Sequence, residues 1–484
     1  MITGPQPGAT ADLSGEKTIF DFFRLFFSME LFALLVLETN AYAARCLLLR
    51  PDGKWVPTNI DEITAWLGIR LYMSIFHLPD MRMYWSEDHL FGNNPMSHVM
   101  TRDRFENISR YFHASNTTQN PARGQPGHDR ICHVRPLITM IVDKCRTLYN
   151  PHINTSVDEA MVAFRGRLGF RQYIPSKPTK YGIKVWIRAD PVNGYANDFQ
   201  VYTGKVEGRA EIGLCSRVVL DLVQGLDHKG HIVNTDNFFS SPALSNALLL
   251  RGIYSRGTVR PNRHDFPKAM LTGINLRGDY KVVQKGPLLA IAWMDRKPVH
   301  FVSNADNPIN LRSNVQRRQR DGSIVHFPCP TTVVHYNENM NGVDVADQLR
   351  TKYPTSRKSN KWWHSLFWFL FDLCIVNSFI IRKESPNHQE LTRTGAVKPF
   401  SMLDFRKCLI KSLIGNYREG RKRTLPPNVN EAGIAHWPRK TAKAGRCIWC
   451  RQNGRRSAPK SECTGCDRHL CLECFIPHHE NLNT

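Results

Sequence analysis

Residues 153–164, INTSVDEAMVAF, form a short run of small and branched apolar side chains with two acidic residues in its middle. Short runs of this kind, bounded by Gly, Pro or Asn, are typical of β-strands. Similar runs follow at residues 184–191, 198–204, 218–223, 231–238 and 252–260. A helix-like stretch, SPALSNALLLRG, lies between the last two runs. The mixture predicts an α/β sheet domain.

The segments on either side of this domain are predicted to be mainly helical. Apolar residues recur at helical spacing in residues 20–49, 61–76 and 102–115, and again in residues 343–353 and 361–383. Between them, residues 261–332 alternate like strands, and MDRKP at 294–298 separates two such runs as a hairpin turn would. We therefore expect a small β-rich insertion in an otherwise α/β and helical chain.

The composition points to a polyanionic partner. The chain has 484 residues, 42% of them hydrophobic, and a formal net charge of +23. Such a charge attracts DNA, RNA or anionic membrane surfaces. Membrane insertion is not expected, because charged residues interrupt the apolar segments 19–37 and 366–381, which are predicted to be buried helices. The N-terminus lacks the basic region and apolar run of a secretory signal.

Four aspartates lie where a sheet could present them to a substrate. Asp158 lies in the first predicted strand, Asp236 follows the run HIVNT, and Asp344 and Asp347 share one face of a predicted helix. Each alone has an ordinary explanation as a turn or solvated residue. As a set they suit phosphodiester cleavage, which uses two divalent ions about 4 Å apart. Mg²⁺ takes oxygen ligands of this kind.

Several long motifs resemble those of piggyBac transposases and of proteins derived from them. The motifs are SVDEAMVAFRGRLGFRQYIPSKPTKYGIKVW at 156–186, TDNFFSS at 235–241, YNENMNGVDVADQLRTKYPTSRKSNKWW at 336–363 and MTRDRFENISRYFH at 100–113. They occur in the family's order, and the resemblance extends from about residue 18 to residue 479. Many family members also carry a long acidic N-terminal region, whereas this chain begins almost at the first helical segment.

The resemblance implies an RNase H-like catalytic core with a β-rich insertion. A split all-α dimerisation and DNA-binding domain flanks this core, and a small cysteine-rich zinc-binding domain follows. The expected division is 18–152 for the first helical part, 153–260 for the first part of the core, 261–332 for the insertion, 333–353 for the last part of the core, 354–425 for the second helical part, 426–444 for a basic linker and 445–484 for the zinc domain.

The resemblance also implies a reaction and a nuclear location. Matched motif by motif, Asp158, Asp236 and Asp344 correspond to the family's catalytic triad, and Asp347 to a fourth acid associated with activity. The triad would hold two Mg²⁺ ions for nicking a transposon end, forming a hairpin and joining the end to TTAA target DNA. A homodimer on double-stranded DNA is expected. The alternative is a domesticated DNA-binding protein without transposition activity.

Three CxxC pairs near the C-terminus predict zinc binding, because this spacing lets two thiolates reach one tetrahedral ion. In an interleaved arrangement Cys447, Cys450, Cys471 and Cys474 would share one Zn²⁺. The second Zn²⁺ would be held by Cys463, Cys466, His478 and His479, with His469 as an alternative ligand. A third interpretation is that the chain is an interaction module that acts through this domain alone, as ubiquitin ligases or histone-binding proteins do.

Basic residues near these motifs are candidates for contact with DNA phosphates. After the first strand these are Arg165, Arg167, Arg171, Lys177 and Lys180; after the third aspartate they are Arg357, Lys358 and Lys361; in the zinc segment they are Arg446, Arg451, Arg455 and Arg456. Exposed loops of ordinary charge are the alternative for the first group. The run RKR at 421–423 suits nuclear import or phosphate contact.

Overall fold

The computed structural model describes residues 6–480 apart from 52, 89, 92, 93, 206–210, 310, 320 and 419–437. The chain divides into two units, residues 1–417 and residues 418–484. Residues 426–437 of the predicted basic linker, and the run at 421–423, lie outside the described residues.

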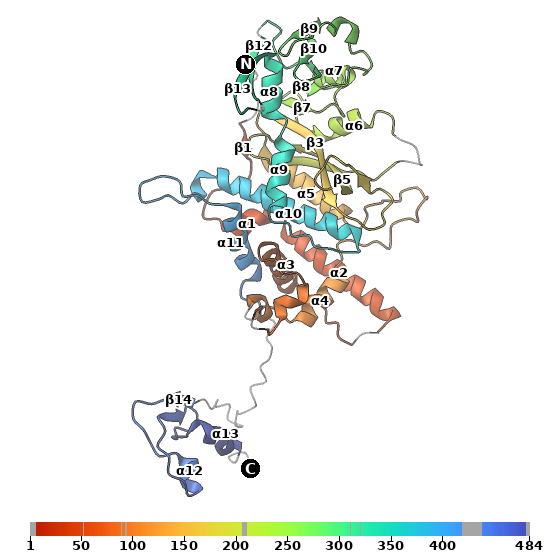
Figure 1. Ribbon diagram of the computed structural model, residues 1–484. Helices are drawn as coiled ribbons and strands as arrows, with labels where there is room; N and C mark the ends of the chain where they lie inside the picture. Colours follow the sequence, from red (N-terminus) through yellow and green to blue (C-terminus); the bar gives the residue numbers. More distant parts are fainter. Residues whose placement is uncertain are drawn as a thin grey trace. The chain divides into compact units, whose positions relative to one another are not determined.

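A nine-stranded mixed sheet forms the centre of the first unit (Figure 1). The strand order is β4-β5-β3-β7-β8-β11-β10-β9, and β6 pairs with β5. β3, β7 and β8 are parallel to one another, whereas β3–β5 and β5–β6 are antiparallel. The strands are β3 (Asn154–Ala163), β4 (Gln172–Tyr173), β5 (Tyr181–Ala189), β6 (Ala196–Val201), β7 (Ile232–Thr235), β8 (Tyr254–Thr258), β9 (Tyr280–Lys285), β10 (Leu288–Met294) and β11 (Pro298–Ser303).

Helices cover both faces of the β3–β5–β7 part of the sheet. On one face Val157 and Trp186 pack in a core with α6 (Leu214–Leu222) and α7 (Pro242–Leu250). On the other face Ala160 and Ile187 belong to the main core, with α5 (Arg135–Thr147) and α10 (Trp362–Glu384). Both faces of β3 and β5 therefore contribute apolar side chains to a core.

The predicted β-rich insertion continues the main sheet with β9, β10 and β11 and adds a separate two-stranded sheet. β11 pairs with β8, and β10 joins β11 at the predicted hairpin, where Met294 is opposite Pro298. A separate two-stranded hairpin follows, formed by β12 (Arg312–Arg318) and β13 (Ile324–Pro330). It leads into α8 (Thr331–Asn339) and α9 (Gly342–Thr351), the helix that carries the last two predicted aspartates.

The helical part comes from both ends of the first unit. It contains α1 (Ile19–Arg24), α2 (Met29–Leu49), α3 (Ile60–Ile75), α4 (Arg102–Tyr111) and α11 (Met402–Ile414). α11 packs on α3 so closely that a Cβ added at Gly68 would lie 2.8 Å from the Ile414 side chain (Figure 1). The helix predicted over 20–49 is two helices, because Ser28 adopts an extended backbone just before α2.

Among the described residues, two helices, α2 and α10, are long and apolar enough to cross a membrane. α10 agrees with the prediction of a buried helix, since 94% of its most apolar window is inside the protein. In α2 only 33% of the most apolar window is buried inside the protein. Leu37, Leu48 and Leu49 are exposed on it, so α2 buries one face only.

The remaining elements of the two units are short. β1 (Gly8–Ala9) pairs with β2 (Tyr149–Asn150), and four 3₁₀ turns span Met81–Trp85, Pro95–His98, Lys268–Leu271 and Pro386–His388. The second unit contains β14 (Pro438–Lys440), paired with β15 (Ser461–Cys463), and the helices α12 (Ile448–Gln452) and α13 (Leu472–Glu480).

Candidate active site and metal-binding cysteine groups

Two predicted aspartates lie on neighbouring parallel strands. Asp158 lies within β3, and Asp236 directly follows β7. The register pairs Val157 with Thr235, so Asp158 and Asp236 are the next residues along the two strands. Neighbouring strands are about 4.8 Å apart. The sheet therefore brings together two carboxylates that are far apart in sequence.

The first turn of α9 carries Asp344 to the same region. A Cβ added at Gly342 would lie 2.5 Å from the Ser156 hydroxyl oxygen and 2.9 Å from the Ala189 carbonyl oxygen. Only glycine permits so close an approach of this helix to β3 and β5. Asp344 is exposed, whereas Asp347, one turn later, forms an ion pair of 2.9 Å with Arg350.

Lys177 lies among these acidic groups. Its ammonium nitrogen is 3.7 Å from a carboxylate oxygen of Asp158 and 3.8 Å from one of Glu159, and it donates a 3.1 Å hydrogen bond to the Glu159 carbonyl oxygen. Burial acts to lower the pKa of Lys177, but the surrounding carboxylates outweigh burial and raise it. Those carboxylates are Asp158, Glu159, Asp344 and Asp347.

Burial disfavours the charged forms of the carboxylates in the cluster. It raises the pKa of Asp158 to about 7, although the nearby ammonium of Lys177 acts in the opposite direction. Burial also raises the pKa of Asp236, against a hydrogen bond from the backbone N–H of Phe238. A cation close to these carboxylates would favour their charged forms.

The donor atoms of this cluster fit Mg²⁺, which prefers carboxylate oxygens. Their spacing in the structure is wider than that of a closed metal cage. Among the described residues, three or more metal-ligating atoms lie within 4.8 Å of one another only in two groups near the C-terminus. The aspartates thus form an acidic site around Lys177, whose ammonium is the cation nearest to Asp158 among the described ion pairs.

Sequence reasoning did not identify Glu159 or Lys184 as part of this site. Glu159 accepts ion pairs from Lys177 and, at 3.6 Å, from Lys184. The ammonium of Lys184 also lies 4.5 Å from the centre of the Phe238 ring, two residues after Asp236. Glu159 directly follows Asp158 in sequence, and this adjacency was the one sequence feature that could have indicated its place in the site.

The first cysteine group of the second unit matches the predicted interleaved pairing. Cys447, Cys450, Cys471 and Cys474 form a four-residue set, with sulfur–sulfur distances of 3.4 Å for Cys450–Cys474 and 3.7 Å for Cys447–Cys471. Burial acts to raise the pKa of Cys447, but hydrogen bonds from the backbone N–H groups of Cys450 and Cys471 lower it to about 7. A lowered thiol pKa favours the thiolate that binds metal.

The second group contains Cys463, Cys466 and His479. The sulfur of Cys466 lies 3.4 Å from Nε2 of His479. His478 is buried but is not part of the three-residue group, and its ring lies 6.1 Å from that of Trp449. His469, the alternative ligand, has Nε2 at 4.0 Å from a carboxylate oxygen of Glu462. Of the predicted histidines, His479 therefore lies beside the two cysteines, and the group offers three potential metal ligands.

Comparisons with known proteins agree with the motifs and the geometry. A family model described as "Transposase IS4" matches residues 20–379. PiggyBac transposable element-derived protein 3 from Homo sapiens is 28% identical, covering 96% of this chain and 76% of that protein. PiggyBac transposable element-derived protein 5 from Homo sapiens is also 28% identical, covering 84% and 78%. A piggyBac transposase solved as a synaptic complex with hairpin DNA has a TM-score of 0.72 and 26% identity, covering 97% of this chain and 98% of that one.

The chain belongs to the piggyBac group of the transposase IS4 family. The structural likeness covers 97% of this chain, so it includes the mixed sheet and the helices from both ends of the first unit. Family membership also makes the aspartates around Lys177 the first candidates for the active site of this piggyBac family member.

The predicted DNA-contacting residues near β3 differ in their surroundings. Arg165, Arg167 and Lys180 are exposed. Arg171 is exposed too, but it donates hydrogen bonds to the carbonyl oxygens of Arg165 (2.7 Å) and Gly166 (3.0 Å), so it also shapes its own loop. Lys177 points into the acidic cluster instead of lining an open surface.

Of the three basic residues that follow the third aspartate, Arg357 and Lys361 use their charge inside the protein. Arg357 donates to the carbonyl oxygens of Leu78 and Met73, and Lys361 donates to that of Arg110. These bonds join α10 and the preceding loop to the first helical part, a structural use that the sequence did not reveal. Lys358 is exposed. In the second unit the four predicted arginines, Arg446, Arg451, Arg455 and Arg456, are all exposed.

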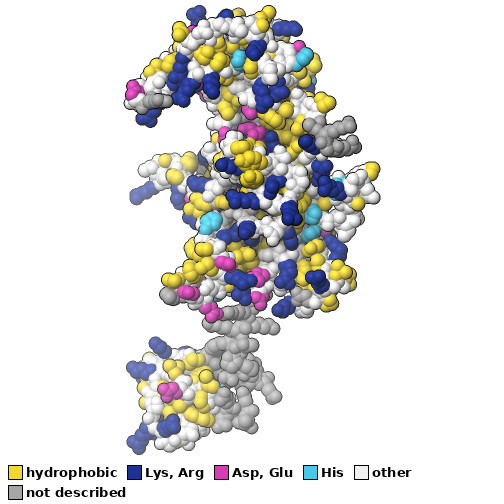
Figure 2. Space-filling view, turned by 45° about the vertical axis from the view of Figure 1, so that its right-hand side comes forward, with side chains coloured by type: hydrophobic (Ala, Val, Ile, Leu, Met, Phe, Trp, Pro, Cys, Tyr) yellow, Lys and Arg dark blue, Asp and Glu magenta, His cyan; other side chains and the backbone are white. Residues whose placement is uncertain are grey.

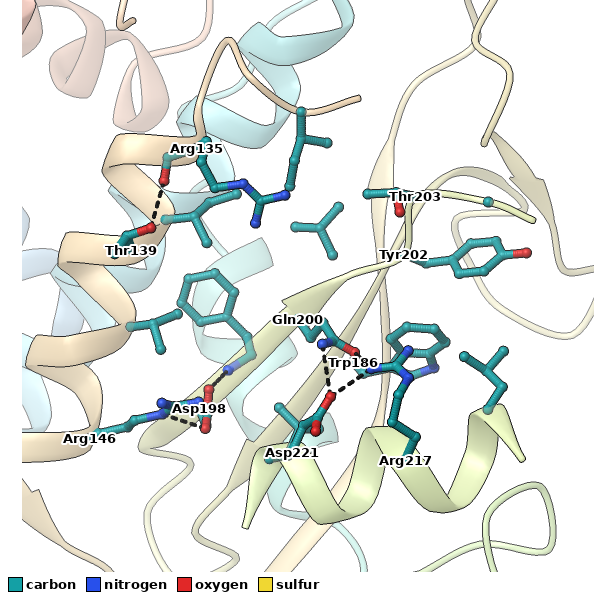
Figure 3. A pocket seen from close by; sticks show the side chains of 18 of the residues that line it. Arg135, Thr139, Arg146, Trp186, Asp198, Gln200, Tyr202, Thr203, Arg217 and Asp221 are labelled. Carbon is teal, nitrogen blue, oxygen red and sulfur yellow. Dashed lines mark hydrogen bonds and ion pairs between the residues drawn. The ribbon is translucent and has the colours of Figure 1, made fainter. Parts of the chain in front are cut away.

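A cavity of about 590 Å³ lies between α5, β6 and α6 (Figure 3). Its arginines are already paired: Arg146 with Asp198 and Arg217 with Asp221, each at 2.6 Å. The third, Arg135, pairs with Asp129 at 2.7 Å. None of the candidate active-site residues lines it. The acidic cluster of this piggyBac family member is therefore separate from the cavity.

Proposed function

We propose that this protein is a piggyBac-type cut-and-paste DNA transposase whose active site contains Asp158, Asp236 and Asp344. The observation that carries the proposal is the arrangement of the three aspartates, on or directly after adjacent parallel strands and on a helix packed against them, around the half-buried ammonium of Lys177. Asp347 supports the site through its position one turn after Asp344.

The strand order supports an RNase H-like core. In the order β6-β5-β3-β7-β8, the first three strands are antiparallel and the last three are parallel. The first two aspartates lie on the central pair, β3 and β7. The insertion then separates them in sequence from the helix that carries the third.

Surface charge and the solved relative support double-stranded DNA as the substrate. Figure 2 shows Lys and Arg side chains scattered over much of the face of the first unit, whereas acidic side chains gather in few places. The solved piggyBac transposase is a complex with hairpin DNA. We propose transposon ends and TTAA target DNA as substrates, a homodimer to hold two ends, and a nuclear location.

In this proposal the aspartates hold two Mg²⁺ ions. When bound, the ions would activate the attacking water or 3′ hydroxyl and stabilise the leaving oxygen of the in-line displacement. Asp158 and Asp236 are positioned by the sheet, and Asp344 by the contact of Gly342 with Ser156. Arg165, Arg167 and Lys180 would contact the DNA backbone beside the site.

The same residues carry out four successive displacements in the proposed reaction. Water first cleaves one strand at the transposon end and releases a 3′ hydroxyl. That hydroxyl then attacks the opposite strand to form a hairpin, which releases the flanking DNA. A second water opens the hairpin and regenerates the 3′ hydroxyl, and this hydroxyl attacks the target. We further propose that the two cysteine groups bind Zn²⁺, with His478 or His469 completing the second group, and that Arg446, Arg451, Arg455 and Arg456 contact DNA.

The test is metal-dependent nicking of a duplex that contains the DNA flanking the gene. The wild-type chain should nick it in Mg²⁺ and not in EDTA, and Asp158→Asn, Asp236→Asn and Asp344→Asn should each lower the rate at least 100-fold while DNA binding remains. Asp143→Asn, on the exposed surface of α5, is the control and should keep full activity.

The outcome that contradicts the proposal is DNA binding without cleavage in any divalent metal. Binding that weakens steeply with salt would then identify a domesticated DNA-binding protein. Unchanged DNA binding after deletion of the residues following Lys443 would show that the cysteine-rich unit acts on another partner.

A further inference from the structure

Lys177 is carried by a stiff loop that directs it at the acidic cluster. The loop follows β4, and Lys177 lies between Pro175 and Pro178. The backbone N–H of Lys177 donates to the carbonyl oxygen of Ile174 at 3.3 Å, and the N–H of Ile174 donates to that of Lys180 at 2.9 Å. Because proline fixes one backbone dihedral, the two prolines and these hydrogen bonds restrict the backbone on either side of Lys177.

The cluster has more carboxylates than cations. Its acidic groups are Asp158, Glu159, Asp236, Asp344 and Asp347. Each of the other two cations has one carboxylate partner here: Lys184 contacts Glu159, and Arg350 contacts Asp347. The ammonium of Lys177, by contrast, is within 4 Å of two carboxylates and feels the charge of two more. Lys177 is thus the cation shared by the cluster.

The contact between Lys177 and Asp158 is an ion pair without a direct hydrogen bond. At 3.7 Å it is an ion pair longer than a hydrogen bond, whereas the 3.1 Å hydrogen bond of Lys177 goes to a backbone carbonyl oxygen. The side chains of Asp158 and Lys177 are only 19% and 24% exposed, so water screens their attraction weakly. A divalent cation would need the same carboxylate oxygens, and the two positive charges would repel each other.

We propose that Lys177 is a built-in counter-ion of the aspartate cluster, which stabilises the metal-free protein and competes with divalent cations for the site. This inference rests on the proposed function, because it takes the cluster to be the metal site. It gives Lys177 a role in the protein without DNA, which differs from the phosphate contact expected from the sequence.

The test compares Lys177→Met with Lys180→Met, an exposed lysine of the same loop. Binding of Mn²⁺ to the full chain without DNA is measured by electron paramagnetic resonance. Removing the competing charge should strengthen Mn²⁺ binding on the order of tenfold. Thermal unfolding in EDTA should shift down by several degrees, because the carboxylates then repel one another without compensation. Lys180→Met should change neither quantity.

Two further variants distinguish a failure of the proposed metal site from a failure of the role proposed for Lys177. Lys177→Arg retains the charge and should unfold in EDTA within about a degree of the wild type. Asp344→Asn should weaken Mn²⁺ binding; if it does not, the proposed metal site is wrong, while unfolding in EDTA still decides the role of Lys177. Unchanged or weaker Mn²⁺ binding by Lys177→Met, or an unfolding temperature in EDTA equal to that of the wild type, would overturn the inference.

Discussion

Buried histidines lie where the residues after α4 meet α10. His113 is 5% exposed, stacks on Tyr42 with ring centres 4.1 Å apart, and contacts the Trp363 ring. Within the described chain neither ring nitrogen of His113 has a hydrogen-bond partner. Burial and the nearby cations lower the pKa of His113 to about 4 and that of His364 to about 3. Both histidines are therefore neutral in the folded protein at pH 7.

These lowered pKa values predict a loss of stability in acid. As the pH falls below about 6.5, the unfolded chain takes up protons that the folded protein accepts only near pH 4. His113→Phe keeps the stacked ring and removes the unpaired nitrogens. It should raise the free energy of unfolding at pH 7.5 by about 1 kcal/mol. It should also reduce the loss between pH 7.5 and 5.5 by about 1 kcal/mol.

Urea unfolding at the two pH values measures both effects. His98→Phe, at an exposed position, is the control and should keep the pH dependence of the wild type. The explanation is wrong if His113→Phe and the wild type lose the same stability on acidification.

At the scale of elements, local patterns predicted most strands and helices but not how they join. The strand around Asp158 and the hairpin at 294–298 are where the sequence placed them. The helix expected over 20–49 is broken between α1 and α2, where Ser28 adopts an extended backbone. The insertion joins the main sheet because β11 pairs with β8, a long-range pairing that periodicity does not reveal.

The cysteine groups give a prediction about metal content. The full chain should bind two Zn²⁺ ions, because its four-cysteine group and its Cys463–Cys466–His479 group are separate. Cys447→Ser should lose the ion of the first group, and Cys463→Ser that of the second. Metal analysis by mass spectrometry measures this content, and Cys215→Ser, outside both groups, should retain two ions. Two ions retained by Cys447→Ser would contradict the assignment.

At the scale of the whole molecule, the candidate site depends on contacts between distant segments. The sequence could name Asp158, Asp236 and Asp344 as candidates, because carboxylates suit divalent ions. It could not show that the register of β3 and β7 aligns the first two, or that Gly342 lets α9 approach β3. The place of Lys177 among them depends on a loop whose path no local pattern specifies.

The central claim is that these three aspartates form one site for two divalent ions. Its most direct test is anomalous diffraction from crystals of the protein with a transposon-end duplex, soaked in Mn²⁺. We predict two Mn²⁺ peaks about 4 Å apart, each coordinated by carboxylates of Asp158, Asp236 or Asp344. Crystals that show no Mn²⁺ peak among these aspartates, with their carboxylates still too far apart to share an ion, would contradict the account.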